Sequence, residues 1–182
     1  IGAGKTLTIN ASRTLDVYGN IDKVGTFTAN TSTVKLYGCS NPTTITSTTG
    51  ISFYNLVIDN SYGINLSGTF NATITNSLSL LNGIVSTGTN YLIVSSTTAG
   101  NLTYTNGFEN GNLRRNIATN TSTYNFPVGN GTSSTDRHIV SLLNNSLTGV
   151  TYINASVSDF TQSAPNSDAL LNTYQGTVPI IA

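Results

Sequence analysis

Residues 14–19 read Thr-Leu-Asp-Val-Tyr-Gly, and residues 33–38 read Thr-Val-Lys-Leu-Tyr-Gly, 19 positions later. The pattern continues as Leu-Val-Ile-Asp-Asn at 56–60 and as Leu-Ser-Leu-Leu-Asn at 78–82, with 22 positions between Val34, Leu56 and Leu78. Each copy is a short run in which apolar and polar residues mostly alternate. A degenerate period of about 19 to 22 residues built from such runs is typical of a solenoid.

The alternation within each repeat predicts which side chains are buried, because successive side chains of a strand point to opposite faces. We expect the apolar positions to stack as inward ladders, formed by Leu15, Val17, Val34, Leu36, Leu56, Ile58, Leu78 and Leu80. The residues between them form one outward column, Asp16, Lys35, Val57 and Ser79. Adjacent coils of a parallel ladder lie about 4.8 Å apart. Asp16 and Lys35 are therefore predicted to form a surface ion pair.

These patterns predict an all-β chain in two parts. Residues 1–112 are expected to form a parallel β-helix of about five irregular coils. From residue 113 the repeat is lost, and strand-like runs are separated by long polar turns. Residues 113–182 are therefore expected to form an antiparallel, β-sandwich-like unit, which has too few strands to be complete. An antiparallel sandwich throughout is the main alternative, but it does not explain near-identical hexapeptides at a regular offset.

The amino-acid composition supports the all-β prediction and argues against two kinds of partner, nucleic acids and membranes. The 182 residues include 31 Thr, 24 Asn and 21 Ser, but only seven Lys or Arg and seven Asp or Glu. Thr favours strands, and both Asn and Thr are poor helix formers. A nucleic-acid binder needs clustered Lys and Arg, and a membrane-spanning helix needs about 18 apolar residues in a row. The sequence has neither, so we expect no nucleic-acid partner and no membrane insertion.

The sequence offers no cluster of residues that predicts catalysis. β-Helical enzymes that cleave polysaccharides gather acidic and basic side chains in one groove. Here the acids are scattered: Asp16, Asp22, Asp59, Glu109, Asp136, Asp159 and Asp168. With one histidine, His138, and one cysteine, Cys39, no metal site is indicated. We expect a protein that is not an enzyme, with no catalytic residues, no cofactor and no metal.

Two surface features are candidates for ligand binding. Tyr18 and Tyr37 occupy equivalent positions in two repeats, and exposed aromatic columns bind sugars or partner proteins. A flat Thr-x-Thr face on a β-helix orders water in some ice-binding proteins. That motif recurs here at close to the coil spacing, at Thr6 and Thr8, Thr26 and Thr28, and Thr44 and Thr46. The simpler alternatives are that tyrosines pack the turns and that Thr is abundant because it favours strands.

The C-terminal residues are a candidate for assembly with another subunit. Residues 177–182 form an apolar, strand-like tail, and an apolar strand can complete the open sheet edge of another subunit. Val178, Ile180 and Ile181 are therefore the candidate assembly residues. The alternative is that the tail packs on its own sheet.

The only basic pair, Arg114 and Arg115, is expected to lie at the edge of the junction between the two parts. Because the sequence starts with Ile rather than Met, we expect a processed product or a piece of a longer protein.

Part of the sequence is similar to known proteins. Residues 53–66 read Phe-Tyr-Asn-Leu-Val-Ile-Asp-Asn-Ser-Tyr-Gly-Ile-Asn-Leu, and residues 78–94 read Leu-Ser-Leu-Leu-Asn-Gly-Ile-Val-Ser-Thr-Gly-Thr-Asn-Tyr-Leu-Ile-Val. These stretches resemble the β-helical regions of large secreted surface proteins of Bacteroidota. Gly-Asn-Leu-Arg-Arg-Asn-Ile at 111–117 and Tyr-Asn-Phe-Pro-Val-Gly at 124–129 resemble the β-sandwich segment that often follows. The resemblance implies an adhesin exported by the type IX secretion system, and it implies no catalytic residues.

We therefore expect a non-catalytic structural or adhesive segment or subunit of an extracellular bacterial cell-surface protein or filament. Its expected partners are other copies of itself or further domains of a larger chain, together with surface glycans. The alternative is a carbohydrate-binding or ice-binding β-helical module. A polysaccharide-degrading enzyme ranks third.

Overall fold

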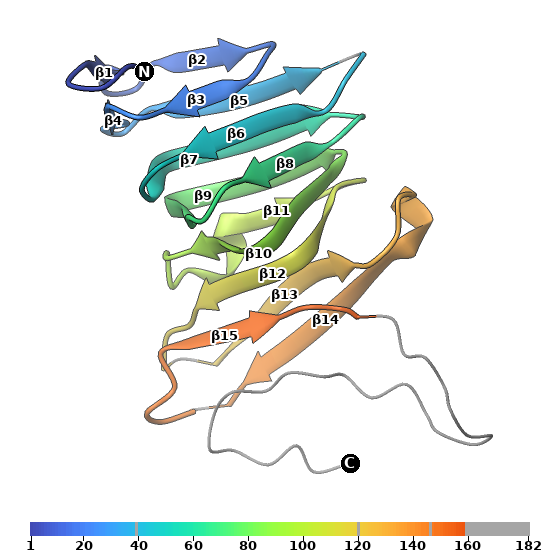
Figure 1. The fold of residues 1–182 in the computed structure, drawn as a ribbon. Coiled ribbons are helices and arrows are strands. Elements are labelled where there is room, and N and C mark those ends of the chain that lie inside the picture. Colours follow the sequence, from blue (N-terminus) through green and yellow to red (C-terminus); the bar gives the residue numbers. More distant parts are fainter. Residues whose placement is uncertain (39, 120, 146, 159–182) are drawn as a thin grey trace.

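The chain winds into a β-solenoid of about six turns that stack along one axis (Figure 1). The computed structural model describes residues 1–38, 40–119, 121–145 and 147–158. The main ladder joins β2, β5, β7, β9, β10 and β12, and every pair in it is parallel. These strands span Thr14–Val17, Thr33–Gly38, Ile51–Asn60, Ala72–Asn82, Ile84–Val94 and Phe108–Asn116. The predicted all-β solenoid is confirmed, with about one turn more than expected.

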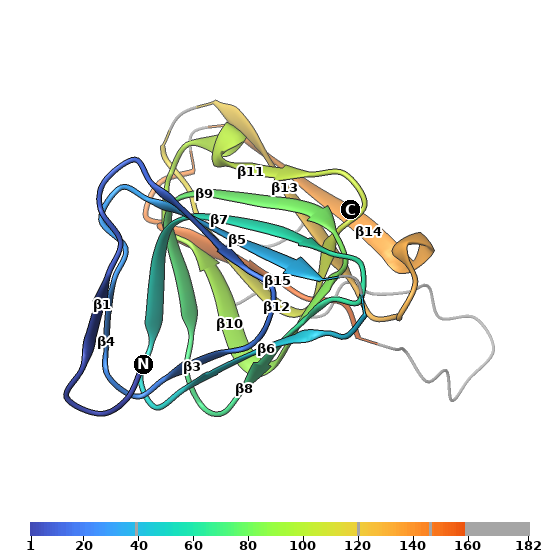
Figure 2. The ribbon, with the colours of Figure 1, turned by 90° about the horizontal axis from the view of Figure 1, so that it is seen from above.

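Shorter strands form the other sides of the solenoid, so that strands surround the interior when the stack is seen from above (Figure 2). On one side β3 (Ile21–Lys23), β6 (Thr43–Ser47) and β8 (Ile64–Ser67) pair in parallel, and β8 also pairs with β10. On another side β1 (Thr6–Thr8) and β4 (Thr26–Thr28) form a separate two-stranded sheet. Late in the stack, β11 (Leu102–Tyr104) pairs with β9.

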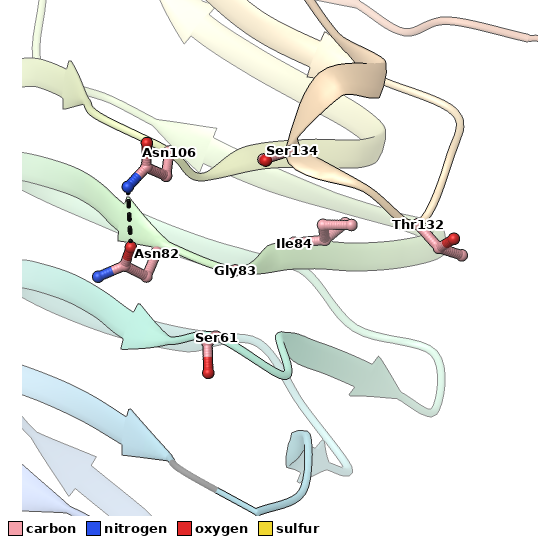
Figure 3. A pocket seen from close by; sticks show the side chains of 7 residues that line it. All are labelled: Ser61, Asn82, Gly83, Ile84, Asn106, Thr132 and Ser134. Carbon is pink, nitrogen blue, oxygen red and sulfur yellow. Dashed lines mark hydrogen bonds between the residues drawn. The ribbon is translucent and has the colours of Figure 1, made fainter.

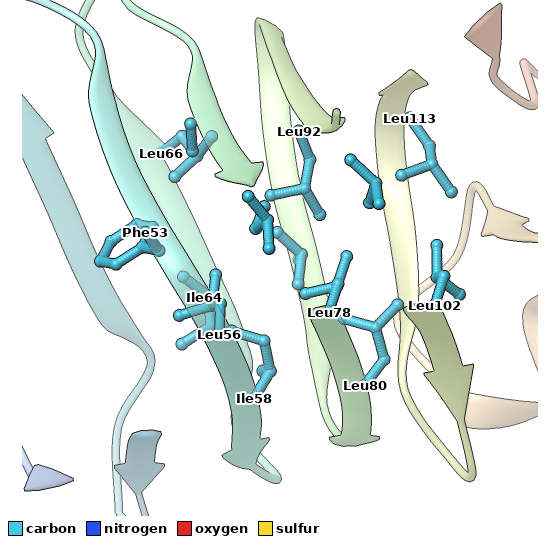
Figure 4. Close-up of a cluster of buried hydrophobic side chains, with 14 of the residues drawn as sticks. Phe53, Leu56, Ile58, Ile64, Leu66, Leu78, Leu80, Leu92, Leu102 and Leu113 are labelled. Carbon is cyan, nitrogen blue, oxygen red and sulfur yellow. The ribbon is translucent and has the colours of Figure 1, made fainter. Parts of the chain in front are cut away.

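The register follows the predicted alignment of the repeats. Leu15 pairs with Val34, Val34 with Leu56, and Leu56 with Leu78, while the outward residues pair in the same order. From the second predicted repeat onward, the inward residues are fully buried (Figure 4). Leu15 and Val17 are only partly buried, because they lie in the first strand of the ladder and pair on one side alone. The predicted inward ladders are confirmed.

The predicted ion pair between Asp16 and Lys35 is wrong, although the two residues are register partners. The Nζ atom of Lys35 lies 3.1 Å from Oδ2 of Asp59 on the following turn. It also lies 4.1 Å from the centre of the Tyr37 ring on its own strand. Long side chains in a strand lean along the strand direction, and here that lean takes the ammonium group away from Asp16 and towards Asp59.

The end of the described chain differs from the predicted second part. The boundary expected after residue 112 falls inside β12, which continues the parallel ladder. β13 (Ser122–Gly129) also pairs in parallel with β12, through its last two residues. Only β14 (Arg137–Asn144) and β15 (Tyr152–Ala155) pair antiparallel, with β13 and β12 respectively. Among the described residues the antiparallel strands extend the solenoid's own sheet, and no separate sandwich is seen. Residues 159–182, with Val178, Ile180 and Ile181, lie outside the described part.

The buried ladder gives a direct stability test. Ile58 is 1% exposed, so Ile58→Val removes a methylene group from a packed interior and is expected to destabilise the protein by about 1 kcal/mol. Ile139 on β14 is 40% exposed, and Ile139→Val is the matched control, expected to change stability by less than about 0.5 kcal/mol. Urea unfolding measures both changes. Equal losses would contradict the assignment of Ile58 to the core.

Candidate functional site

A column of outward side chains runs along the solenoid where the strands of the main ladder end. Tyr18 and Tyr37 stack with their ring centres 5.0 Å apart and their planes 10° from parallel. Tyr37 pairs in register with Asp59, and Asp59 pairs with Asn82. Asn106, on the next turn, is hydrogen-bonded to Asn82. The two tyrosines predicted as equivalent are therefore neighbours, but the column continues as polar residues rather than as aromatic ones.

Hydrogen bonds order the polar half of this column. Asn82 Nδ2 donates to Asp59 Oδ1 at 2.7 Å, and Asn106 Nδ2 donates to Asn82 Oδ1 at 3.1 Å. The hydrogen bond from Asn82 and the ion pair with Lys35 lower the pKa of Asp59 below its usual value, against an opposing effect of partial burial. Asp59 is therefore ionised at neutral pH, and its charge orients both amide groups with their NH₂ ends towards it.

A polar pocket of about 390 Å³ lies at the end of the column (Figure 3). Its lining comes from three stacked turns and from a later loop: Ser61, Asn82, Gly83, Ile84, Asn106, Thr132 and Ser134. Gly83 has a φ of +89°, and a Cβ there would overlap the carbonyl oxygen of Asn60. Only glycine fits this close approach of two turns.

The loop that supplies Thr132 and Ser134 is held by its own hydrogen bonds. It contains a 3-10 turn, η2 (Ser134–Asp136), with a capping box in which the Ser133 amide donates to Asp136 Oδ2 at 2.9 Å. Next to it, Arg137 donates to the carbonyl of Thr105 and lies 5.5 Å from the ring centre of Tyr104. These contacts tie the loop to the outside of the solenoid, beside Asn106.

The structure divides the predicted threonine face. Thr6 pairs with Thr26 and Thr8 with Thr28, so four of the six residues form a two-strand patch on β1 and β4. Thr44 and Thr46 lie on β6, where they pair with Asn65 and Ser67 of β8. The patch therefore spans two turns and does not continue onto the third Thr-x-Thr motif.

The basic pair lies inside β12 of the main ladder, where β15 pairs antiparallel with it, and not between two separate units of the described chain. The Arg114 guanidinium sits between two rings, 4.6 Å from the centre of Tyr91 and 4.3 Å from that of Tyr152. Arg115 is fully buried, and donates to the carbonyls of Asn125 at 2.8 Å and Ala99 at 2.7 Å. Burial lowers the pKa of Arg115 to about 10, so it is still charged at neutral pH.

A second buried ionisable group was not suspected from the sequence. Glu109 on β12 is fully buried, and its Oε1 accepts a hydrogen bond from Thr87 Oγ1 at 2.6 Å, while Oε2 has no hydrogen-bond partner. Burial raises the pKa of Glu109 to about 8, against the opposing effect of the Thr87 hydrogen bond. The sequence around Glu109 does not indicate that its side chain is buried. Glu109 follows an apolar residue and precedes polar ones, a pattern that is also common for exposed acids.

The remaining acids of the described chain do not join these groups. Asp16 and Asp22 lie on β2 and β3, and Asp136 caps η2, whereas Asp159 and Asp168 lie outside the described residues. Within residues 1–38, 40–119, 121–145 and 147–158, no three His, Cys, Asp or Glu side chains gather as metal ligands would. The same part of the chain contains no helix with the length and apolarity needed to cross a membrane.

Comparison of the chain with known protein families, with curated proteins and with solved structures gives no match.

Proposed function

We propose that the chain is a non-catalytic structural and adhesive segment of an extracellular protein at the bacterial cell surface. Its partners are other copies of itself or further domains of a larger chain. The observation that carries the proposal is the continuous parallel ladder from β2 to β12, which arrays an ordered polar column on its outer surface. The cell-surface location, and export by the type IX system, follow from the resemblance stated above.

The physical properties of the ladder suit this role. Each turn is hydrogen-bonded to the turns beside it, so the stack is stiff along its axis and repeats the same outer positions at a spacing of about 4.8 Å. Hydroxyl and amide groups dominate the composition, and the one ion pair in the column neutralises itself. Contacts made by uncharged groups depend little on ionic strength, which suits a surface exposed to changing salt.

A carbohydrate-binding module is the second candidate, and two observations favour it. The polar pocket offers hydroxyl and amide groups, and the Tyr18–Tyr37 stack leaves Tyr18 76% exposed. Ice binding has weaker support, because the threonine patch covers two turns only. Cleavage of polysaccharides ranks below both.

Retention on polysaccharide matrices, measured together with cleavage, separates an adhesive or carbohydrate-binding function from a polysaccharide-degrading one. The full chain is passed over columns of immobilised neutral polysaccharides, and the same polysaccharides are incubated with it and assayed for new reducing ends. The proposal predicts retention on at least one matrix without new reducing ends. New reducing ends above a heat-denatured control would contradict a non-catalytic function. Absence of retention on every matrix, and on a matrix carrying the protein itself, would contradict an adhesive one.

A further inference from the structure

We infer that the pocket lined by Ser61, Asn82, Asn106, Thr132 and Ser134 is a binding site for an uncharged, hydroxyl-rich carbohydrate. This inference rests on the adhesive role proposed above, and it names the ligand class and the place where the ligand is held. The volume of about 390 Å³ falls in the range of roughly 300 to 1,000 Å³ that is usual for small-ligand pockets.

The lining groups match the hydrogen-bonding pattern of a sugar. A sugar hydroxyl both donates and accepts, and it is best matched by groups that also do both. Ser61, Thr132 and Ser134 each bring a hydroxyl, which is a donor and an acceptor. Asn82 and Asn106 bring amide groups, which carry a donor end and an acceptor end. Most small-molecule pockets are predominantly apolar, and a pocket with this lining suits a polar ligand instead.

The ordered column sets the direction in which Asn106 faces. The Lys35 ammonium group and the neutral NH₂ group of Asn82 both point at the Asp59 carboxylate, and Asn106 directs its own NH₂ group at Asn82. Its carbonyl oxygen, Oδ1, is consequently turned away from Asn82 (Figure 3). Asn82 therefore leaves the Oδ1 acceptor of Asn106 unused, and the amide group is oriented before a ligand arrives. Groups that are ordered in advance lose less entropy on binding.

The charged side chains near the pocket already have ion-pair or hydrogen-bond partners within the protein. No charged side chain lines it, and Lys35 and Asp59 neutralise each other at the far end of the amide column. Beside the loop, Asp136 accepts from the Ser133 amide, and Arg137 donates to the carbonyl of Thr105. A charged sugar would have to give up water without gaining a free opposite charge, so the site favours a neutral one.

The experiment is a binding measurement on a printed array of neutral, sialylated and sulfated oligosaccharides, followed by affinity measurements on the best neutral ligand. Asn106→Ala removes the oriented acceptor, and Asn106→Ala with Ser61→Ala removes two lining groups. Asn65→Ala is the matched control, because Asn65 is also an exposed asparagine but lies on β8, outside the pocket. Circular dichroism checks that each variant keeps its β spectrum.

We expect the wild-type chain to bind neutral oligosaccharides in preference to charged ones. One neutral hydrogen bond contributes a factor of about five in affinity, so Asn106→Ala should weaken binding about fivefold, the double variant at least about tenfold, and Asn65→Ala not at all. Neutral binding that both pocket variants retain would overturn the assignment of the pocket, while leaving the adhesive role intact. Preference for charged oligosaccharides, or no binding to any of them, would overturn the ligand class. The adhesive role fails separately, through the matrix experiment above.

Discussion

Replacing Glu109 by Gln should leave the stability of the protein unchanged at pH 4 and raise it on the order of 4 kcal/mol at pH 8. The carboxyl group is fully buried and accepts a hydrogen bond from Thr87. Burial raises its pKa from 4.5 to about 8. A buried carboxylate without a cation is strongly disfavoured, whereas the neutral acid and the amide of Gln are similar in shape and in burial cost.

The sign of the pH dependence follows from proton binding. Between pH 4.5 and about 8, folded Glu109 holds a proton that the unfolded chain has lost. Stability therefore falls as the pH rises through this window and levels off above pH 8. Urea unfolding at half-unit steps from pH 4 to pH 9 measures the slope. Glu109→Gln should flatten it.

An exposed acid provides the control for this effect. Asp16 lies on the outer face of β2 and is exposed, so Asp16→Asn should leave the slope between pH 5 and 8 as it is in the wild-type protein. A wild-type chain whose stability does not change in that window would contradict the burial of Glu109. So would a slope that persists in Glu109→Gln.

Replacing Arg115 by Ala should destabilise the protein by roughly 3 to 5 kcal/mol. The guanidinium joins β12 to the carbonyls of Asn125 on β13 and of Ala99 in a 3-10 turn, η1 (Ala99–Asn101). Truncation leaves both carbonyls without this donor and opens a cavity beside Tyr124 and Phe126, whose rings face the guanidinium. Relief of the buried charge offsets part of this loss, but it does not supply the missing donors.

The neighbouring arginine is a matched control for this prediction. Arg114 points outward between the rings of Tyr91 and Tyr152, where cation–π contacts contribute about 0.5 to 1 kcal/mol each. Arg114→Ala should therefore destabilise the protein by about 1 to 2 kcal/mol. Thermal or urea unfolding gives both values. An Arg114→Ala loss as large as that of Arg115→Ala would contradict the burial of Arg115.

The sequence predicted correctly those features of the fold that recur in every repeat. Alternation of apolar and polar residues predicted the inward ladders, because a register slip of one residue would expose every apolar side chain of a strand. The alignment of residues 14–19 with 33–38 likewise predicted that Tyr18 and Tyr37 are neighbours, and their rings stack. These predictions depend on periodicity alone, and periodicity is visible in a single sequence.

The sequence could not show features that depend on single contacts between distant segments. The pocket combines Ser61, Asn106 and Thr132, which come from different turns and from a loop that folds back. Loss of the repeat from residue 113 onward suggested a new unit, yet β12 and β13 still add to the same sheet. Strand pairing continues there without repeat identity, because β12 keeps a buried apolar residue, Leu113, in register with Leu92 of β10.

Adhesion under flow tests the central claim, that the solenoid is an adhesive segment which holds neutral glycans. Beads coated with the full chain are allowed to settle on a surface bearing neutral oligosaccharides, and the shear stress that detaches half of them is measured. We predict that wild-type and Asn65→Ala beads resist a shear stress that removes uncoated beads, and that beads carrying Asn106→Ala with Ser61→Ala detach earlier. Wild-type beads that detach as readily as uncoated ones would contradict the account.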